Sequence, residues 1–472
     1  MRRGGEYVRS EFGHRTNYMG SMRMNKGFDE KKSPTTGNQD LVKELNQAVI
    51  LNIIWRHAPI SRAEIARVSG LTRGTVSSLV DELIGESYVK EMGAGTSAMG
   101  RKPIMLQLNA GAGVIVGVDL GVNYILIILA DLRAEVLARK RLAISPEMGE
   151  KWILEKMLRG IEEILTQAPP TPRGLLGIGA GVPGLVEMEH GILKFAPNLR
   201  WKNVPLKDIL QERFDAPVYV DNEANVGALG EKWFGAGQGV RHMVYLSVGM
   251  GLGAGIVLNG ELYRGATGYA GELGHFTILP DGPLCGCGNR GCWEVLASEN
   301  ATLRRAREVL SPAPRTGSEE EQRHSQGQGQ EGQEEQEQRP QQEEGQEDRQ
   351  EEKRGQEWFE AGDLSVDVLL DACERGDQAA QRVLKDTGRY LGIGIAGLVN
   401  AFNPEVVIVG NTIGRCGHWV LDEATKEMEA RGLSQLIKGV KVVPAMLGPD
   451  ACAIGGVSLV LSDFLRLPRI AF

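Results

Sequence analysis

One histidine and three cysteines lie close together in the sequence, and their types and spacing are typical of a metal site. They are His275, Cys285, Cys287 and Cys292. One imidazole and three thiolates form a closed tetrahedral ligand set, and thiolates favour zinc over hard cations. The alternative, three free thiols beside a solvated histidine, fits this ligand set poorly. The sequence therefore predicts a structural zinc site that leaves no position open for metal-assisted catalysis.

Two glutamates bracket the cysteines, and an amide and a third glutamate lie upstream. They are Glu272, Glu294, Asn222 and Glu223. Each sugar hydroxyl both donates and accepts hydrogen bonds, so carboxylates and amides on a rigid metal-bound loop suit a hydroxyl-rich ligand. Taken singly, each of these residues would be read as a solvated surface group, and only their combination indicates a binding site.

The elements that must position these residues follow from the spacing of apolar side chains. From residue 113 onward, strand-like apolar runs alternate with helical ones, which indicates a parallel or mixed sheet covered by helices. The expected strands are 114–118, 125–130, 176–181, 218–220, 243–248 and 406–409, and the expected helices are 151–165 and 378–402. We assign residues 109–472 to this α/β domain.

Residues 41–108 are predicted to form a separate, mostly helical unit. Helix 61–69, turn 70–72 and helix 72–85 match a helix-turn-helix in length and turn chemistry, and Ser61 with Glu64 forms a capping-box pattern. The apolar face of the last helix is expected to pack inward. That face consists of Val76, Leu79, Val80, Leu83 and Ile84.

The opposite face of this last helix carries short or flexible donors that suit base edges and phosphates in a DNA major groove. These are Arg73, Gly74, Thr75, Ser77 and Ser78. A glycine-rich segment that ends in Arg101 and Lys102 resembles the wing of a winged helix, which would bring both side chains to the DNA backbone. The alternative is a small helical protein–protein module.

The formal charge of −8 comes from one segment, because residues 316–357 hold 14 acidic and 5 basic side chains. Glu and Gln supply 25 of these 42 residues, so the segment cannot bury enough apolar surface to offset its ordering entropy. We expect a disordered acidic insertion there, and a flexible arm over residues 1–40. The first 103 residues carry 16 bases and 11 acids, which weakly supports DNA binding.

No stretch approaches the roughly 18–20 apolar residues of a membrane span. The N-terminal segment is polar and lacks the apolar core of a secretory signal. These features exclude a membrane protein and a secreted protein, so we expect a cytoplasmic location.

Glycine-rich motifs make the chain resemble the repressor–kinase (ROK) family of sugar-binding proteins, and within it the xylose-responsive transcriptional repressors. The motifs are 246–255, 260–265 and 270–275, and the resemblance to the repressors also covers 38–106, 117–132 and 221–231. The resemblance implies an actin-like (ribonuclease H-like) fold, in which two α/β lobes enclose a sugar cleft. With the winged helix, it implies a sugar-responsive repressor.

The resemblance also implies roles for individual residues. Sugar contacts would come from Asn222, Glu223, Glu272, His275 and Glu294, and zinc ligands from His275, Cys285, Cys287 and Cys292. His275 would use one ring nitrogen for each task. The expected partners are a palindromic operator DNA and a sugar effector such as xylose, bound by a homodimer or a dimer of dimers.

Three departures from the kinase members of the family argue against catalysis, so we expect no enzyme and no catalytic residue. Glu223 stands where kinases have an aspartate base, and an extra methylene displaces that carboxylate. The first phosphate loop reads Asp-Leu-Gly-Val-Asn at 119–123 and lacks a glycine and a hydroxyl. The second reads Gly-Met-Gly at 249–251 and lacks another hydroxyl.

Two alternatives to a sugar-responsive repressor remain at this stage. One is an active sugar kinase with a regulatory DNA-binding domain. The other is a DNA-binding architectural or activator protein whose sugar lobe serves only for dimerisation. We also hypothesise that Glu223, being longer than aspartate, fills the space of a hexose 6-hydroxymethyl group and so favours a pentose.

Overall fold

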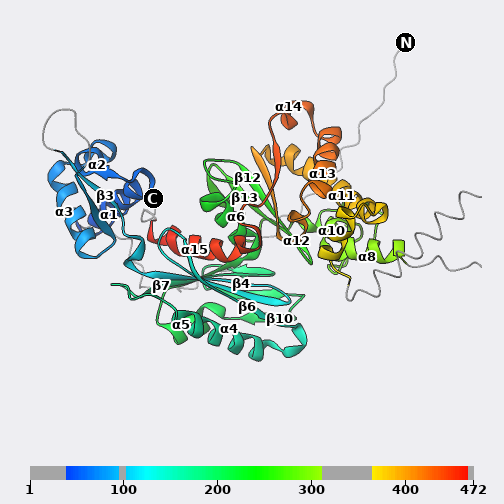
Figure 1. Ribbon diagram of the computed structural model, residues 1–472, viewed down its shortest axis with the longest axis horizontal. Helices are drawn as coiled ribbons and strands as arrows, with labels where there is room; N and C mark the ends of the chain where they lie inside the picture. The colour runs from blue at the N-terminus through cyan, green and yellow to red at the C-terminus, as the bar shows by residue number, and fades with distance from the viewer. Residues whose placement is uncertain (1–38, 95–101, 311–363, 466–472) are drawn as a thin grey trace, which may run out of the picture.

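The computed structural model describes residues 39–94, 102–310 and 364–465. A winged helix lies at one end of the molecule and is followed by two α/β lobes (Figure 1). Nearly all of the predicted arm, the tip of the predicted wing with Arg101, and the acidic insertion lie outside the described residues. Within the described part, no helix is long and apolar enough to cross a membrane.

The N-terminal unit is a helix-turn-helix with a small antiparallel sheet. Its elements are α1 (Gln39–His57), β1 (Ile60–Ser61), α2 (Arg62–Ser69), α3 (Arg73–Gly85), β2 (Val89–Ala94) and β3 (Ile104–Leu108). The sheet has the order β1-β3-β2. The predicted capping box is confirmed, because Ser61 Oγ accepts from the Glu64 amide and Glu64 accepts from the Ser61 amide.

The predicted apolar face of α3 forms the core of this unit. Val76, Leu79, Val80 and Leu83 are buried, and Ile84 packs against the same core. Gly70 adopts a left-handed conformation at φ 74°, which ends α2 and turns the chain into α3. The polar side of α3 therefore faces away from the core.

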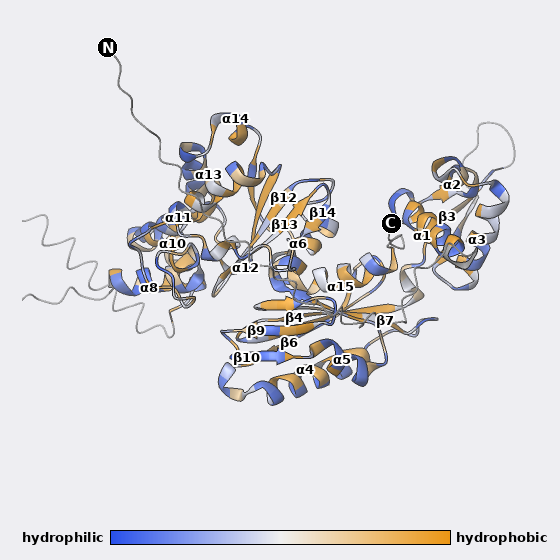
Figure 2. Ribbon diagram, turned by 180° about the vertical axis from the view of Figure 1, so that it is seen from behind, coloured by the Kyte–Doolittle hydropathy of each residue, from blue (hydrophilic) through white to orange (hydrophobic). Residues whose placement is uncertain are grey.

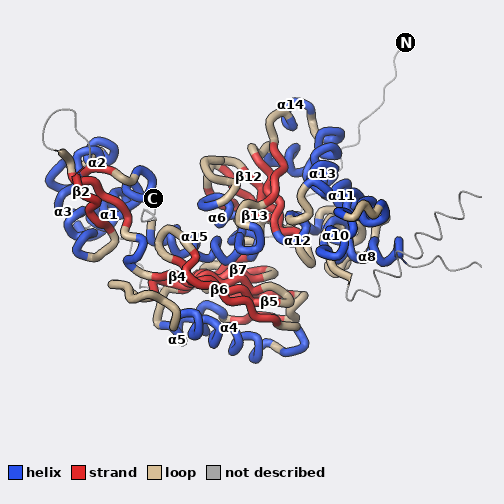
Figure 3. Tube along the Cα trace, viewed as in Figure 1, coloured by secondary structure: helices blue, strands red, loops and turns tan. Residues whose placement is uncertain are grey.

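The first lobe is a five-stranded sheet with the order β11-β7-β4-β5-β6. Its strands are β4 (Val114–Leu120), β5 (Tyr124–Ala130), β6 (Val136–Ala143), β7 (Leu175–Val182) and β11 (Val218–Asn222). Figure 3 shows the sheet between α15 (Ala451–Phe464) on one face and α4 (Glu150–Leu165) and α5 (Leu206–Phe214) on the other. In Figure 2, α4 and α5 mix apolar and polar residues, as expected of helices with one buried face.

A three-stranded antiparallel sheet is appended to the first lobe. Its strands are β8 (Leu185–Glu187), β9 (Ile192–Ala196) and β10 (Trp201–Val204), in the order β10-β9-β8. The sequence did not predict these strands, because each is short and alternates apolar with polar residues only briefly.

The second lobe contains another five-stranded sheet, with the order β14-β13-β12-β15-β16. Its strands are β12 (Met243–Val248), β13 (Leu252–Leu258), β14 (Glu261–Tyr263), β15 (Val406–Gly410) and β16 (Lys441–Pro444). Helix α6 (Glu223–Phe234) covers one face, and α11 (Gln378–Phe402) with α13 (His418–Arg431) covers the other. Shorter helices complete the lobe: α7 (Glu294–Ala297), α8 (Glu299–Leu310), α10 (Val366–Glu374), α12 (Asn411–Gly414) and α14 (Ser434–Ile437).

The two large sheets share one topology. In each, an antiparallel meander of three strands is extended by two parallel strands, β7 and β11 in the first lobe and β15 and β16 in the second. This duplicated arrangement is the actin-like fold with two lobes that the resemblance implied.

Helices α6 and α15 lie against each other at the boundary between the lobes, and glycines allow very close packing. A Cβ on Gly179 of β7 would lie only 1.9 Å from the carbonyl oxygen of Gly456 in α15, and a Cβ on Gly455 would lie 1.9 Å from that of Val226 in α6. No larger residue fits at either position without moving a backbone segment.

The variant Gly179→Ala should therefore destabilise the α/β part by roughly 1–3 kcal/mol, because the new methyl group forces α15 away from β7. Gly397→Ala is the matched control. This glycine is exposed in α11, and a Cβ there meets nothing within 4 Å. The control should gain up to about 1 kcal/mol from helix propensity. Urea unfolding followed by circular dichroism checks both, and an unchanged midpoint for Gly179→Ala would contradict the packing argument.

Candidate functional site

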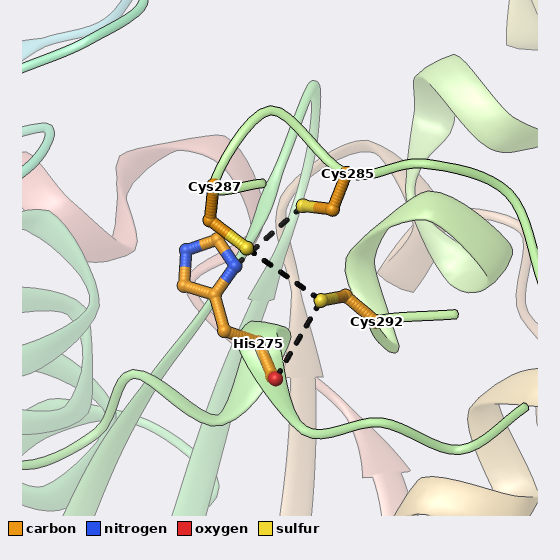
Figure 4. Close-up of side chains that lie close together, drawn as sticks. All are labelled: His275, Cys285, Cys287 and Cys292. Carbon is orange, nitrogen blue, oxygen red and sulfur yellow. Dashed lines mark hydrogen bonds between the residues drawn. The ribbon is translucent and has the colours of Figure 1, made fainter. Parts of the chain in front are cut away.

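The four predicted metal ligands lie together beside the second lobe (Figure 4). Their ligand atoms are all within 4.8 Å of one another. His275 Nδ1 is 3.7 Å from Cys285 Sγ, and the Sγ atoms of Cys287 and Cys292 are also 3.7 Å apart. A tetrahedron with metal–sulfur bonds of about 2.3 Å has edges of about 3.8 Å. The cluster therefore fits one metal ion, and these cysteines form no disulfide.

A short loop brings the cysteines together. The Cys285 amide donates to the Asn289 carbonyl at 2.7 Å, and Gly288 supports this tight turn with φ 92°. Beyond the loop, the buried Trp293 donates from Nε1 to the Tyr390 carbonyl of α11 at 2.9 Å. This contact fixes the end of the loop to the second lobe.

The thiols are poor ligands until a metal displaces their protons. Burial raises the pKa of Cys292 to about 12 and also raises the pKa of Cys285. A hydrogen bond from the Asn289 backbone lowers the pKa of Cys287. Metal binding must therefore release protons, so it weakens as the pH falls.

A cleft of about 850 Å³ opens next to the metal cluster and lies between the two lobes. All five predicted sugar residues line it, namely Asn222, Glu223, Glu272, His275 and Glu294. His275 points Nδ1 at Cys285, and its Nε2 lies 4.0 Å from Glu272 Oε2. The two ring nitrogens thus face the metal cluster and the cleft separately.

Two of the predicted sugar residues also have structural contacts. Asn222 begins α6, where its Oδ1 accepts from the Ala224 amide at 2.9 Å and its Nδ2 donates to the Gly184 carbonyl at 3.0 Å. Glu294 Oε2 accepts from the Leu252 amide at 3.1 Å, and its Oε1 lies 3.9 Å from Cys285 Sγ. Glu294 therefore links the metal cluster to the glycine-rich loop before β13.

Three carboxyl groups of the cleft, those of Asp119, Glu223 and Glu272, have raised pKa values. Burial raises the pKa of Glu223 to about 8, and the charges of Asp119, Glu272 and Glu294 add to this effect. Burial also raises the pKa of Asp119 to about 6 and that of Glu272 above its usual value. Glu223 is therefore mostly uncharged at neutral pH and can donate a hydrogen bond as well as accept one.

The sequence did not reveal the partners of Asp119, which lies at the floor of the cleft. Tyr124 Oη donates to Asp119 Oδ2 at 2.8 Å, and the guanidinium of Arg141 lies 3.9 Å above the Tyr124 ring. All three residues line the cleft. A tyrosine near a strand end is too common to be singled out from sequence, so no local signal could have found this group.

An ion pair joins the two lobes beside the cleft and was also missed. Arg264, just after β14, contacts Asp221 Oδ2 with Nε at 3.2 Å and with Nη2 at 2.7 Å. Asp221 is buried at the end of β11 and also accepts from the Asn222 amide. Since 43 residues separate the partners in sequence, only the fold brings them together.

The predicted DNA-contacting residues of α3 lie on its outer, N-terminal side. Arg73, Gly74 and Ser78 are exposed, and Thr75 and Ser77 are partly exposed. Thr72 caps the helix by accepting from the Thr75 amide at 3.1 Å. Lys102 is exposed just before β3, and Arg101 lies outside the described residues.

Comparison with known proteins decides the family. A model described as "ROK family" matches residues 115–463. The chain belongs to the ROK family. A winged helix-turn-helix DNA-binding model matches residues 47–90 of the same chain.

The curated relatives of this ROK family chain include repressors that match it over most of its length. It is 41% identical to a putative xylose repressor of Caldicellulosiruptor sp. (strain Rt8B.4) over 92% of this chain and 99% of the relative. It is 36% identical to the xylose repressor of Bacillus subtilis (strain 168), over 91% of this chain and 98% of that repressor. A glucokinase of Halalkalibacterium halodurans is 32% identical, over 73% of this chain and 94% of the glucokinase.

The similar solved structures of the ROK family also include both a transcriptional regulator and sugar kinases. A ROK family transcriptional regulator, a homologue of the E. coli MLC protein, is 28% identical and covers 90% of this chain and 98% of its own, with a TM-score of 0.71. A ROK family glucokinase from Streptomyces griseus, in complex with glucose and AMPPNP, is 29% identical. The match covers 74% of this chain and 99% of the glucokinase, with a TM-score of 0.58. The ROK fold predicted from sequence is thus confirmed, and the regulator matches the winged helix as well.

Glu223 should make the protein less stable as the pH rises. Its pKa is about 8 in the folded chain and about 4.3 in an unperturbed glutamate. The folded state therefore holds this proton more tightly, so the associated stability is complete below about pH 4 and is lost as the pH rises through 8. Glu223→Gln stays neutral and should exceed the wild type by about 4–5 kcal/mol at pH 9, since each unit of pKa difference corresponds to about 1.4 kcal/mol. At pH 4 the two should be nearly equal.

Urea unfolding at pH 4, 7 and 9 measures this difference. The exposed Glu212→Gln on α5 is the matched control and should follow the wild type at every pH. A Glu223→Gln variant whose advantage does not grow with pH would show that Glu223 ionises normally.

The cluster should bind one metal ion per chain, and Cys292→Ser should lose it because one of four ligands is weakened. Cys416→Ala is the control, since Cys416 is a buried thiol outside the cluster. Elemental analysis and the thiolate-to-metal absorption of the Co²⁺-loaded protein measure the binding. Equal metal content in the two variants would contradict the site.

Proposed function

We propose that this chain is a xylose-responsive transcriptional repressor. The observation that carries the proposal is that one chain combines a winged helix, whose α3 turns a polar side outward, with an interlobe cleft lined by carboxyl, amide and imidazole side chains. Two relatives named xylose repressors match more than 90% of this chain and support both the sugar and the direction of regulation.

The DNA contacts would come from Arg73, Gly74, Thr75, Ser77 and Ser78 on α3 and from Arg101 and Lys102 of the wing. A homodimer, or a dimer of dimers, would present two copies of α3 to a palindromic operator, because two-fold symmetry in a protein is matched by symmetry in its DNA site. In this proposal residues 41–108 form the DNA-binding domain and residues 109–472 form the sugar-binding and dimerisation domain.

Xylose would bind in the interlobe cleft, where Asn222, Glu223, Glu272, His275 and Glu294 can contact its hydroxyls. Glu223 would fill the space of a hexose 6-hydroxymethyl group. The metal would be zinc, which suits one imidazole and three thiolates and would rigidify the loop that carries His275 and precedes Glu294. Its role there would be structural.

Sugar phosphorylation is the alternative, and relatives named kinases share the α/β part. Phosphoryl transfer needs a general base and close approach of the backbone to phosphates. Here Glu223 stands where kinases have an aspartate base. Because burial raises its pKa to about 8, Glu223 already carries a proton in most molecules at pH 7 and cannot accept another from a sugar hydroxyl. Next to the second glycine-rich loop, the Asn411 side chain occupies the space beside Gly249.

The test is a fluorescence-anisotropy titration of DNA from upstream of the protein's own gene, at fixed salt, with xylose or glucose added. Xylose should weaken DNA binding about 5–150-fold, the range of typical coupling free energies. Glu272→Gln should keep DNA binding and lose the response to xylose. Arg73→Ala should lose DNA binding and keep xylose binding.

Three outcomes would contradict the proposal or part of it. DNA binding that no sugar changes would favour the dimerisation-scaffold alternative. Phosphorylation of xylose or glucose with ATP would favour the kinase. In the same titration, Glu223→Asp should gain affinity for glucose relative to xylose. An unchanged ratio of the two sugar affinities would contradict only the role given to Glu223.

A further inference from the structure

Two helices of the α/β domain end against the winged helix. At the end of α6, Trp233 and Phe234 contact Trp55 of α1, with ring centroids 6.0 Å and 6.3 Å away. At the end of α15, Phe464 packs on Tyr88, with ring centroids 4.6 Å apart. The winged helix therefore has two separate aromatic attachments to the rest of the chain.

A hydrogen bond and a cation–π contact strengthen the attachment at α15. Asn52 Nδ2 of α1 donates to the carbonyl of Leu465 at 3.2 Å. The guanidinium of Arg173, just before β7, lies 4.5 Å above the Tyr88 ring. Leu465 itself is buried in the core of the winged helix.

The same two helices begin at the sugar cleft. Asn222 caps α6, and Glu223 is its first residue, so both residues are at once cleft-lining and part of the helix start. Ala451 and Cys452, the first residues of α15, also line the cleft. Figure 1 shows α15 running from the region between the lobes toward the winged helix. A helix of 12–14 residues spans about 18–21 Å.

Each helix belongs to a different lobe. Helix α15 is held to the first-lobe sheet, where Gly117 and Gly179 lie directly against the carbonyls of Ala453 and Gly456. Helix α6 is held to the second-lobe sheet, where Gly255 lies directly against the carbonyl of Ala224. Because these contacts involve the backbone, each helix follows its own sheet. The two helices also touch each other, with Gly455 against the carbonyl of Val226 and Gly230 against that of Ala451, so motion between the lobes turns one helix about this crossing and shifts the far ends.

We propose that sugar binding is communicated to the winged helix through relative displacement of α6 and α15, and that Trp55 and Asn52 are the positioning residues that receive it. This inference rests on the proposed function. When a sugar draws the lobes together, the far ends of the two helices shift relative to each other. The winged helix is attached to both ends, so it must turn, and α3 leaves the orientation that fits DNA.

The Arg264–Asp221 ion pair lies near the start of this route. It links the second lobe to the residue just before Asn222, at the point where β11 leads into α6. A displacement between the lobes that alters this contact would act directly on the start of α6.

The experiment measures the coupling ratio, defined as the DNA dissociation constant with saturating xylose divided by that without it, for the full-length protein and its upstream DNA. Trp55→Ala removes the aromatic contacts to α6 and also the packing of Trp55 on the side chains of the first-lobe sheet and α15. Asn52→Ala removes only the hydrogen bond to the α15 end. Trp152→Ala is the matched control, because Trp152 is an exposed tryptophan on α4 that contacts Lys156.

Trp55→Ala should reduce the coupling ratio at least fivefold toward 1, while xylose affinity without DNA stays within twofold of the wild type. Asn52→Ala should reduce the ratio by a smaller factor, and Trp152→Ala should leave it unchanged. Trp55→Phe keeps an aromatic ring and should restore most of the coupling. By reciprocity, the effect of DNA on xylose affinity should fall by the same factor in each variant.

The outcomes separate this inference from the proposed function. A wild-type protein that xylose does not release from DNA contradicts the proposed function, and this inference with it. A wild-type response that persists undiminished in both Trp55→Ala and Asn52→Ala overturns this inference alone. If Trp55→Ala does not fold, the same comparison is made with Asn52→Ala and Phe234→Leu, and an unchanged coupling ratio in both variants overturns this inference.

Discussion

The backbone contact between α15 and the first-lobe sheet is the constraint on which the rest of the structure depends. Gly179 and Gly456 bring a strand and a helix together with no side chain between them. On the other side of α15, Gly455 lets α6 lie against the helix, and the starts of both helices line one cleft. The second-lobe sheet can then sit opposite the first. The cleft, the metal loop and the attachments of the winged helix all take their positions from this junction.

The elements with strong local signals could be predicted from the sequence. Apolar runs placed β12 at residues 243–248 and α11 at 378–402, and the capping box at Ser61 placed the start of α2. The metal ligands were predictable because four unusual side chains occur within one short segment. Short strands such as β8 and distant pairs such as Arg264 with Asp221 were not, since their stability comes from contacts made only after the lobes have folded.

His275 shows how one side chain connects two tasks. Its Nδ1 faces the thiols, and its Nε2 faces Glu272 and the cleft. A metal bound at Nδ1 would hold the ring in one orientation and so keep Nε2 directed at a ligand. Glu294 has a similar double position, because it contacts both Cys285 and the loop before β13. His275 and Glu294 therefore connect the metal cluster directly to the wall of the cleft.

The carboxyl groups that line the cleft limit the charge of the ligand that can bind there. Asp119, Glu223, Glu272 and Glu294 line the space where a ligand would lie. Burial raises the pKa of Glu223, and the charges of the other three carboxyl groups raise it further. A neutral sugar enters such a space without electrostatic penalty, whereas a sugar phosphate brings about two further negative charges into it. Under the proposed function, the cleft would therefore favour a free sugar over the same sugar once it carries a phosphate group.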